Sequence, residues 1–585
     1  MIHFVFTEQD TRYLFLKPDT KEDEQNLKLL TKYINLVDPT CYLPTHKGPP
    51  VTQDFIFSYM QPSGKIIYWC SKGLWQEIYK FFKTNNIPFS GLLDNKNTFK
   101  RNIKHSFEQF KEIVDSWGLK LPPRPYQYES AYKILQWKQS VSELATRGGK
   151  TLIAYMVFRY CIEYLNAKRI LMIVPSIQLV TQGYNDFKDY AEFFKTECIW
   201  GGGKLVESAN LTIGTFQSLI KFLDRKSKKY NPSFFNGYDI VFVDETHRAT
   251  ASQIKTIISQ PFMKDTKIAF GMTGTIPHEH TIDYYCLKAL LGATIQKIKP
   301  KFLMDEGYIS KVNISQIRLK YLDINKQIDT FIKCAEYCLS EFDTQERIIK
   351  GGKIRRERIL LNNPEFQIRY KKTLPFGLLD AREHLNDSLV TKHSYIKMLK
   401  SLISGSTSTN MLVIERMMSH FMTERIDYLC NNILPICDKN TLILAHHTEY
   451  INYLYNIIKD KFPDRTISVI TGSVSADKRD KIKQLLKENN NCILIASYGT
   501  LSTGITLANL CFGVLFESFK SEVINMQSIG RGLGLSDLKD EFVLFDIIDC
   551  FDSKIISNKI YLQGLAKIKK YKEEQYPYKI INVEI

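Results

Sequence analysis

Two short segments carry the residues best suited to chemistry. Residues 144–151 read Leu-Ala-Thr-Arg-Gly-Gly-Lys-Thr, and residues 244–247 read Asp-Glu-Thr-His. In a loop that ends in Gly-Lys-Thr, backbone N–H groups can surround phosphate oxygens, the Lys can reach the outer phosphates and the Thr hydroxyl can ligate Mg²⁺. Of two neighbouring carboxylates, one can hold the metal and the other can polarise an attacking water. Together the segments predict a site that binds and hydrolyses ATP.

The sequence around both segments supports this interpretation. Residues 140–144 are expected to form a strand before the loop, and the apolar stretch 152–164 a buried helix after it, which places a phosphate at a helix N-terminus. Residues 238–243 are expected to form a second buried strand. The predicted nucleotide-binding residues are Thr146, Arg147, Gly148, Gly149, Lys150, Thr151 and Asp244, with Thr151 and Asp244 as magnesium ligands and Glu245 as the catalytic residue that activates water.

Apolar runs alternate with helical stretches in two parts of the chain. Near-continuous apolar strands indicate parallel sheets that are covered on both faces. Because only the first part carries a Gly-Lys-Thr loop, we expect the nucleotide to lie in a cleft between two α/β domains. The predicted strands are 169–174, 211–214, 239–243 and 267–270 in the first domain, and 441–445, 466–470, 492–496, 512–516 and 541–545 in the second.

The length of 585 residues requires several domains, because single hydrophobic cores stop growing near roughly 250–300 residues. We predict a small α+β accessory domain at residues 1–119, a stiff proline linker at 121–125, and a first α/β domain at 120–300. Residues 301–585 are predicted to hold the second, with a helical insertion at about 322–425 and a basic C-terminal tail. Basic clusters at 350–358, 369–372 and 567–572 suit either solvated helices or nucleic-acid contacts.

The formal net charge of +17, from 79 Lys and Arg against 62 Asp and Glu, favours a polyanionic partner, most simply nucleic acid. Twelve cysteines without a C-x-x-C spacing indicate a reduced, cytoplasmic protein without structural zinc. No apolar run approaches the roughly 18–20 residues that cross a bilayer, and no signal peptide is recognised. The pairs His278/His280 and His446/His447 are interpreted as structural, because no third metal ligand is evident.

The order of these motifs resembles that of superfamily 2 helicases, which implies two tandem RecA-like domains. Tyr126-Gln127 is similar to the motif that reads adenine, and residues 497–507 and 527–531 are similar to the motifs of the second domain. The resemblance implies that Gln127 and Gly504 bind nucleotide, that Gln527 and Arg531 complete catalysis, that Pro175, Gln182, Thr215, Ser497 and Thr503 contact nucleic acid, and that His247, Thr273 and Thr275 couple hydrolysis to that contact.

Within the superfamily, the chain most resembles the UvsW-type helicases of tailed phages. The shared traits are the small N-terminal domain, Leu144 at the first loop position, the glycines at 201–203, the Ser-Tyr-Gly…Ser-Thr-Gly form of residues 497–504 and the helical, basic C-terminus. The resemblance implies an ATP- and Mg²⁺-dependent DNA helicase that acts on branched, single-stranded or duplex DNA, and on RNA:DNA hybrids in R-loops. It also implies that the accessory domain at residues 1–119 recognises DNA, and that the protein acts in recombination, repair and replication without a membrane partner. We expect a monomer in the host cytoplasm.

One position departs from the family pattern. The last motif usually reads Gln-x-x-Gly-Arg-x-x-Arg, and Gly534 stands where the second arginine is expected. Such an arginine can change turnover by orders of magnitude, so on the family pattern Gly534→Arg is expected to raise DNA-stimulated ATP hydrolysis. Two other interpretations stay open: a DNA-binding or annealing protein with a vestigial ATPase, and the motor subunit of a restriction or nuclease system.

Overall fold

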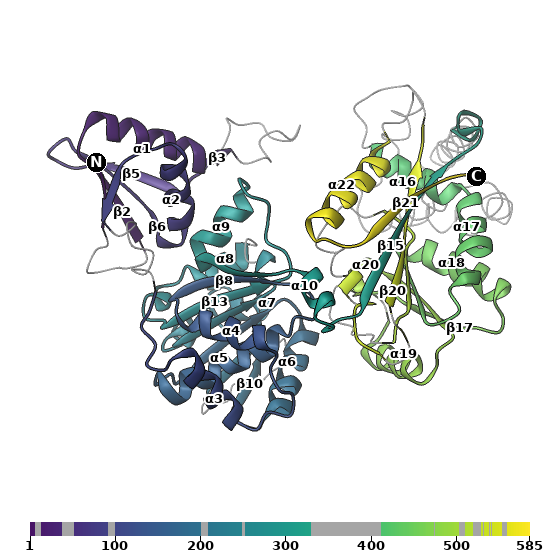
Figure 1. Ribbon diagram of the computed structural model, residues 1–585, viewed down its shortest axis with the longest axis horizontal. Helices are drawn as coiled ribbons and strands as arrows, with labels where there is room; N and C mark the ends of the chain where they lie inside the picture. Colours follow the sequence, from purple (N-terminus) through teal and green to yellow (C-terminus); the bar gives the residue numbers. More distant parts are fainter. Residues whose placement is uncertain are drawn as a thin grey trace, which may run out of the picture. The chain divides into compact units, whose positions relative to one another are not determined.

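The computed structural model (Figure 1) divides into two compact units, Met1–Lys299 and Pro300–Ile585. The first unit joins the predicted segments 1–119 and 120–300, and most of the predicted insertion falls outside the described residues. The structure describes residues 1–5, 13–37, 52–91, 100–199, 209–248, 252–328, 411–472, 474–501, 509–518, 528–530, 532–536, 539, 541–552 and 558–585.

The first unit begins with a five-stranded sheet in the order β5-β6-β2-β1-β7, in which only the β1–β7 pair is parallel. Alternate strand residues pack under two helices in one core, which includes Phe4, Leu16, Leu30 and Phe82. A small α+β domain is thereby confirmed. Its elements are β1 (Ile2–Val5), β2 (Tyr13–Pro18), α1 (Lys21–Ile34), β5 (Ile56–Met60), β6 (Ile66–Ser71), α2 (Trp75–Thr84) and β7 (Phe89–Gly91).

This small domain is packed onto the parallel-sheet domain that follows it. The hydroxyl of Tyr284, on α9 (Ile282–Leu291), donates to the buried carboxylate of Glu77 at 2.6 Å. An ion pair between Lys80 and Glu279 at 3.0 Å lies at the exposed rim. The backbones also meet closely, because a Cβ at Gly73 would lie 1.9 Å from the carbonyl oxygen of Lys288. The contact therefore requires glycine at residue 73.

The first parallel sheet has the order β10-β11-β9-β12-β13-β8-β14, and every pair is parallel. Phe242 packs into one core with Phe158, whereas its neighbour Val241 packs into a second core with Leu287. Both faces are therefore covered, as the apolar runs predict. The strands are β8 (Gln139–Leu144), β9 (Ile170–Val174), β10 (Thr196–Ile199), β11 (Leu211–Thr215), β12 (Ile240–Asp244), β13 (Ile268–Thr273) and β14 (Ala293–Ile298).

Three helices of this domain matter for the site: α4 (Pro125–Leu135), α5 (Lys150–Tyr164) and α6 (Ile177–Tyr190). The predicted linker at 121–125 is shorter than expected, because Pro125 is the first residue of α4. Proline suits that position, since its fixed φ is helical and its missing N–H has no partner there. Two polar strands at the sheet edges, β10 and β14, escaped prediction because they lack apolar runs.

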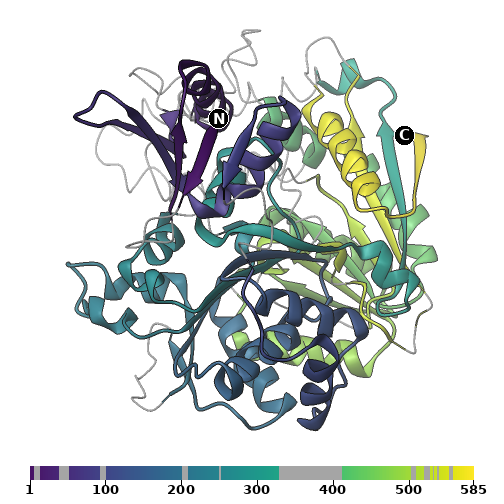
Figure 2. The same cartoon turned by 60° about the vertical axis from the view of Figure 1, so that its left-hand side comes forward.

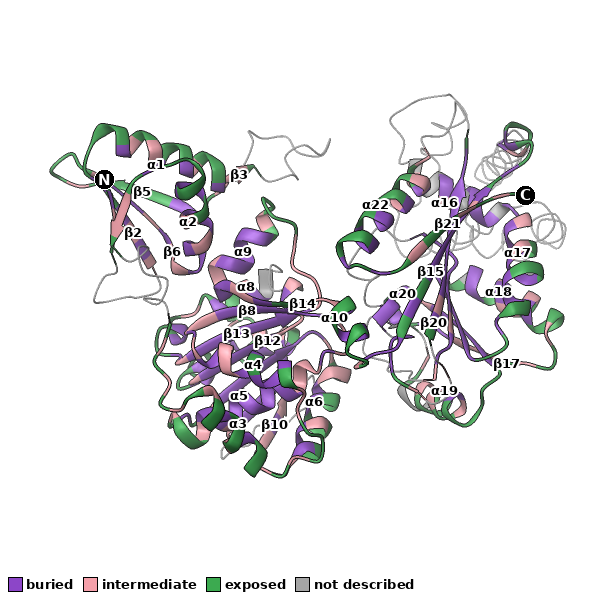
Figure 3. Ribbon diagram, in the orientation of Figure 1, coloured by how far each residue is buried: buried purple, intermediate pink, exposed green. Residues whose placement is uncertain are grey.

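The second unit holds another all-parallel sheet, in the order β17-β18-β16-β19-β20-β15-β21. Figure 3 shows its central strands as buried. Two tandem parallel-sheet domains, consistent with the RecA-like fold, are thereby confirmed. The strands are β15 (Lys311–Lys320), β16 (Thr441–Ala445), β17 (Thr466–Ile470), β18 (Cys492–Ser497), β19 (Phe512–Leu515), β20 (Glu541–Cys550) and β21 (Tyr578–Glu584); the helices used below are α16 (Met411–Phe421), α17 (Glu424–Tyr428), α18 (Thr448–Lys461) and α22 (Lys559–Glu573).

The basic C-terminal tail is part of this fold. In Figures 1 and 2, α22 runs along the second sheet. Lys567 is buried and its Nζ lies 2.5 Å from a carboxylate oxygen of Asp546. Lys570 is also buried and pairs with Glu574 at 3.2 Å. Half of the cluster at 567–572 is therefore structural rather than solvated. Among the described helices, none is both long and apolar enough to cross a bilayer.

Candidate nucleotide and nucleic-acid site

The loop between β8 and α5 has the backbone of a phosphate cradle. Arg147 and Gly149 both adopt left-handed conformations, with φ of 66° and 71°. The N–H of Gly148 donates to the carbonyl of Ala145 at 2.9 Å, and α5 begins at Lys150. A loop turned in this way brings the N-terminus of a buried helix towards the ligand position. Residues 145–149 therefore form a tight turn that leads into the N-terminus of α5, and phosphate binding by this turn stays a prediction.

Gln127 supports this loop from the first turn of α4. Its Nε2 donates to the carbonyl of Gly148 at 3.3 Å, and the hydroxyl of Tyr126 donates to the same carbonyl at 2.8 Å. Its Oε1 accepts from the N–H of Arg124 at 2.8 Å. A Cβ at Gly149 would lie 2.0 Å from this Nε2, which explains the glycine there. Because an amide can make further hydrogen bonds, adenine recognition by Gln127 stays a prediction.

The two acidic residues at the end of β12 face the phosphate loop. Nζ of Lys150 lies 2.7 Å from Oε1 of Glu245, and both side chains are mostly buried. The N–H of Glu245 donates to Oδ1 of Asp244 at 2.9 Å. Glu245 also has a left-handed backbone, with φ of 50°, which is uncommon for a non-glycine residue and marks a constrained turn. The lysine predicted for phosphate and the carboxylate predicted for water are thus in direct contact.

The two carboxyl groups have different environments. Burial raises the pKa of Asp244 to about 6, and the charge of Glu245 raises it further against the opposing effect of Lys150. Burial would also raise the pKa of Glu245, but Lys150 and His247 outweigh this and lower it. Nearby cations therefore outweigh burial at Glu245 but not at Asp244. The carboxylate of Asp244 and the hydroxyl of Thr151 are oxygen ligands of the kind that Mg²⁺ prefers, and magnesium binding by these two residues stays a prediction.

The predicted coupling residues lie next to one another. Nδ1 of His247 is 2.9 Å from Oγ1 of Thr273 and 3.3 Å from Oε2 of Glu245. Thr273 closes a tight turn, donating to the carbonyl of Thr275 at 2.9 Å and accepting from its N–H at 3.2 Å. A Cβ at Gly274, between them, would lie 3.6 Å from Oγ1 of Thr146 in the phosphate loop. The 273–275 turn therefore touches both nucleotide-binding segments.

The residues predicted to contact nucleic acid in this unit follow neighbouring strands. Pro175 follows β9 and Thr215 ends β11, and Thr215 is in register with Val174. Thr215 is buried, and its Oγ1 accepts from the N–H of Ser218 at 3.2 Å, so its hydroxyl is used to cap the short helix α7 (Phe216–Leu219). Gln182 lies on α6. The structure places Pro175 and Thr215 at the carboxyl ends of two neighbouring strands, and the contact of all three residues with nucleic acid stays a prediction.

Sequence reasoning missed Asp186, which lies one turn beyond Gln182 on α6. Burial raises the pKa of the Asp186 carboxyl, while hydrogen bonds from Gln182 and Thr151 oppose the shift. Thr151, a predicted magnesium ligand, therefore interacts with a residue of the helix that carries Gln182. The sequence signal that could have found Asp186 is its spacing from Gln182, because residues four apart on a helix lie on the same face.

In the second unit, the described part of the site is limited to Ser497 and its neighbours. Oγ of Ser497, the last residue of β18, lies 2.6 Å from Oγ1 of Thr500. Gly534 is buried, and its carbonyl accepts from the hydroxyl of Ser310 at 2.8 Å. Four predicted residues lie outside the described residues: Thr503, Gly504, Gln527 and Arg531.

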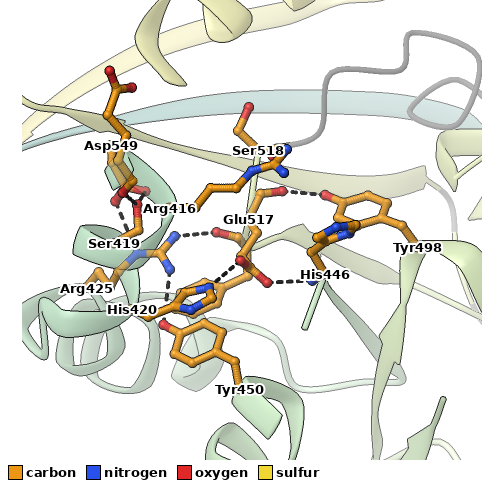
Figure 4. Close-up of polar contacts among 12 residues, drawn as sticks. Arg416, Ser419, His420, Arg425, His446, Tyr450, Tyr498, Glu517, Ser518 and Asp549 are labelled. Atoms are coloured by element: carbon orange, nitrogen blue, oxygen red, sulfur yellow. Dashed lines mark hydrogen bonds and ion pairs between the residues drawn. The ribbon is translucent and has the colours of Figure 1, made fainter. Parts of the chain in front are cut away.

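A second feature that the sequence did not reveal is a buried carboxylate, Glu517, just after β19 (Figure 4). It lies 2.5 Å from Nε2 of His420 on α16 and accepts from the N–H of His446, after β16, at 2.5 Å. Its carbonyl accepts from the hydroxyl of Tyr498, after β18, at 2.7 Å. One residue thus joins the ends of three strands to α16.

The same cluster contains a metal-type donor set. Ligand atoms of His420, His447 and Glu517 all lie within 4.8 Å of one another. The guanidinium groups of Arg416 and Arg425 also interact with the Glu517 charge. Arg425 in turn pairs with buried Asp549 at 3.1 Å. The two guanidiniums balance the two carboxylates, so the cluster is neutral without an added cation, and we interpret it as a hydrogen-bond network.

Acid should destabilise this network. Burial lowers the pKa of His420, and Glu517, which raises it, does not outweigh burial. Burial would raise the pKa of Glu517, but the attraction of His420 and the hydrogen bonds of His420 and His446 lower it. For both groups the unfolded chain binds protons more readily than the folded chain. The stability is therefore present above the unfolded pKa values and is lost as pH falls, first below about 6.5 for His420.

We expect His420→Gln to weaken this acid sensitivity, because glutamine can still donate to Glu517 but does not titrate. The measurement is the thermal unfolding temperature of the full chain between pH 8 and pH 5. Below about pH 6.5, this temperature should fall further for the unchanged protein than for the variant. His278→Gln, at an exposed position of the first unit, is the control and should behave as the unchanged protein. If the unfolding temperatures of His420→Gln and of the unchanged protein fell equally with pH, the assignment of the acid sensitivity to His420 would be wrong.

Two protein families match the chain. Residues 120–278 match the family described as "Type III restriction enzyme, res subunit", and residues 424–533 match the "Helicase conserved C-terminal domain". With the two tandem parallel-sheet domains and the Lys150–Glu245 contact, these matches show superfamily 2 helicase domains in both units of the chain. It is an ATP-hydrolysing helicase, and nucleic acid is its partner.

Within that class the chain is similar to the ATP-dependent DNA helicase UvsW of Enterobacteria phage T4. The two are 24% identical over 532 residues, which cover 88% of each chain. The crystal structure of T4 UvsW aligns over 100% of this chain and 99% of that one, with 19% identity and a TM-score of 0.41. The structure of S. cerevisiae Dbp5 bound to RNA and ADP BeF3 aligns over 82% of this chain and 95% of that one, with 13% identity and a TM-score of 0.45.

Proposed function

We propose that this helicase is an ATP-driven DNA translocase that remodels branched DNA and R-loops in the recombination, repair and replication of a phage. The observation that carries the proposal is the pairing of Lys150 with Glu245, which brings the phosphate loop and the DETH segment into one site. The alignment with a phage DNA helicase along 88% of both chains supports DNA as the substrate.

In the proposed mechanism, the phosphates lie in the loop at residues 145–149 and at the N-terminus of α5. The N–H groups of Ala145 and Gly148 already donate to carbonyl oxygens, so other backbone N–H groups of the loop would hold the phosphates. Lys150 moves from Glu245 to the outer phosphates, because these carry more negative charge than one carboxylate. This releases Glu245 to orient the attacking water and to accept its proton. Thr151 and Asp244 would hold Mg²⁺, which when bound neutralises charge on the phosphates.

The second unit is proposed to complete the site and convert hydrolysis into movement. Gln527 and Arg531 would contact the outer phosphate when the two RecA-like domains close, with Gly504 nearby. The contact between His247 and Thr273 would transmit the state of Glu245 to the 273–275 turn. DNA backbone contacts are assigned to Pro175, Gln182, Thr215, Ser497 and Thr503, and because they address phosphates, affinity should fall steeply with salt.

The decisive experiment measures steady-state ATP hydrolysis by the full chain with no nucleic acid, and with single-stranded DNA, duplex DNA, forked DNA or an RNA:DNA hybrid. We expect stimulation by DNA and the largest stimulation by the forked substrate, on which strand displacement is then scored. Size-exclusion chromatography with light scattering is expected to show a monomer. Stimulation by RNA alone, or cleavage of the DNA, would contradict the proposal.

A second candidate function, DNA binding or annealing with a vestigial ATPase, is favoured by Gly534. The structure changes what we expect of that position. Gly534 is buried and its carbonyl accepts a hydrogen bond from Ser310, so an arginine side chain at this position would begin in a packed environment. Overpacking costs about 1–3 kcal/mol, and burying a charge without a partner costs more. DNA-stimulated turnover by the unchanged chain would exclude the vestigial function.

The family pattern alone predicts that Gly534→Arg raises ATP hydrolysis. From the structure we expect instead that this substitution lowers the thermal unfolding temperature and does not raise hydrolysis. Gly534→Ala is the matched control, because it adds only a methyl group at the same place. Both variants are compared by thermal unfolding and by DNA-stimulated ATPase. A folded, stable Gly534→Arg protein with faster hydrolysis would show that the side chain reaches the phosphate after all.

A further inference from the structure

The N-terminal sheet has one covered and one open face, and the open face carries a row of large side chains. Val5 on β1 is in register with Phe15 on β2, Phe15 with Trp69 on β6, and Trp69 with Phe57 on β5. Residues directly opposite on antiparallel strands point to the same face. The row therefore crosses four neighbouring strands.

The aromatic rings of this row are not part of the domain's core. The core contains the alternate residues Phe4, Leu14, Leu16 and Cys70, which pack beneath α1 and α2. In contrast, Phe57 is 40% exposed and Tyr59, two residues further along β5, is 46% exposed. Folding of the domain does not account for aromatic residues on this face.

Three of the rings on this face contact one another. Phe57 and Trp69 are stacked with centroids 4.6 Å apart and planes 24° apart, and Tyr13 contacts the edge of Trp69 at 5.1 Å. Exposed lysines lie beside them: Lys17 is two residues after Phe15 on the same face, and Lys65 immediately precedes β6. Exposed aromatic rings with neighbouring cations are the features that hold unpaired bases and their phosphates.

We propose that this open face, defined by Tyr13, Phe15, Phe57, Tyr59 and Trp69, binds single-stranded nucleic acid by stacking unpaired bases. The inference rests on the proposed function, and it names the partner of the N-terminal domain. Duplex DNA is the poorer ligand, because its bases are already stacked on one another. Duplexes are held mainly through phosphates, and among the described residues of this domain two lysines, Lys17 and Lys65, lie beside the rings.

The position of the small domain suggests a role for its open face. Contacts of Glu77 with Tyr284 and of Lys80 with Glu279 fix the small domain to the first parallel-sheet domain. A strand stacked on the open face is therefore held on the same compact unit as the phosphate loop. Such an anchor would keep a displaced single strand from pairing again.

The test is a double substitution, Phe57→Ala with Tyr59→Ala, at two exposed positions that the core does not need. Binding of the full chain to a labelled oligothymidylate is measured by fluorescence anisotropy, alongside a blunt duplex. We expect about tenfold weaker binding of the oligothymidylate, and little change for the duplex. The matched control is Leu29→Ala, because Leu29 is a 55% exposed apolar residue on α1 of the same domain.

Salt dependence provides a second readout. The double variant removes no charge, so the slope of binding against salt should stay as in the unchanged protein, whereas Lys17→Ala should make it shallower. Equal binding of the oligothymidylate by double variant and unchanged protein would overturn the inference, as would an equal loss for the duplex. The inference would also be overturned if the unchanged protein formed a concentration-dependent dimer and the double variant did not. The face would then bind a second copy of the chain.

The outcomes separate this inference from the proposed function. Lys150→Ala should bind the oligothymidylate normally, because it alters only the nucleotide site. DNA-stimulated hydrolysis by the unchanged protein together with unaltered binding by the double variant would reject the stacking face alone. Absence of both hydrolysis and DNA binding in the unchanged, folded protein would reject the proposed function as well. Thermal unfolding of each variant confirms that the small domain is intact.

Discussion

Replacing Lys150 by alanine is expected to abolish ATP turnover while leaving DNA binding largely unchanged. Lys150 is the first residue of α5 and the only lysine of the 144–151 loop segment, so the substitution removes the point charge that reaches the outer phosphates. Removing one preorganised donor from a transition-state site typically costs about 10²–10³ in turnover. The assay is DNA-stimulated ATP hydrolysis, with oligonucleotide binding measured in parallel.

The structure supplies a matched control for this result. Lys133 and Glu129 form an exposed i, i+4 ion pair on α4 at 3.4 Å, in the same unit as the Lys150–Glu245 pair. Lys133→Ala removes a lysine of the same kind from a surface pair, which is worth at most about 1 kcal/mol, and should hydrolyse ATP normally. Lys150→Ala leaves Glu245 without its lysine, so its unfolding temperature is measured first. Hydrolysis retained by a folded Lys150→Ala protein would falsify the assignment of this loop.

The second large effect is expected for Glu245→Gln, which should bind ATP but not turn it over. Glutamine has nearly the same shape, but it cannot accept the proton of the attacking water, and loss of a general base typically costs about 10²–10⁴. In the structure, Nζ of Lys150 lies 2.7 Å from Oε1 of Glu245. Removing the carboxylate charge therefore frees the lysine for the phosphates, and ATP affinity should be equal to or higher than that of the unchanged protein.

Binding of a fluorescent ATP analogue and single-turnover hydrolysis separate these two effects. Glu129→Gln, at the other half of the surface pair, is the control and should leave both unchanged. If Glu245→Gln lost nucleotide binding, its carboxylate would be a metal ligand or a structural group instead. The left-handed backbone of Glu245 makes the conservative substitution preferable to alanine, because the turn at the end of β12 is constrained.

Much of the fold was predictable because the central strands are continuous apolar runs. The expected strand at 441–445 coincides with β16 residue for residue, and the expected strand at 492–496 differs from β18 only by its last residue. In contrast, β10, β14, β15 and β21 escaped prediction. Their sequences mix polar and apolar residues, and all but β15 lie at a sheet edge or end, where one side of the strand is not buried. Periodicity cannot distinguish such strands from loops.

The sequence by itself determined the chemistry of the nucleotide site. Gly148, Gly149, Lys150 and Thr151 are contiguous, as are Asp244 and Glu245, and apolar runs before each segment place both at strand ends, so local order was enough to predict phosphate and metal binding. Only the tertiary structure decided how distant residues combine. Register between strands builds the aromatic row of the N-terminal sheet, and packing brings Lys150 to Glu245, Gln127 to Gly148, and Glu517 to His420. Such contacts depend on where whole elements lie, which no local pattern encodes.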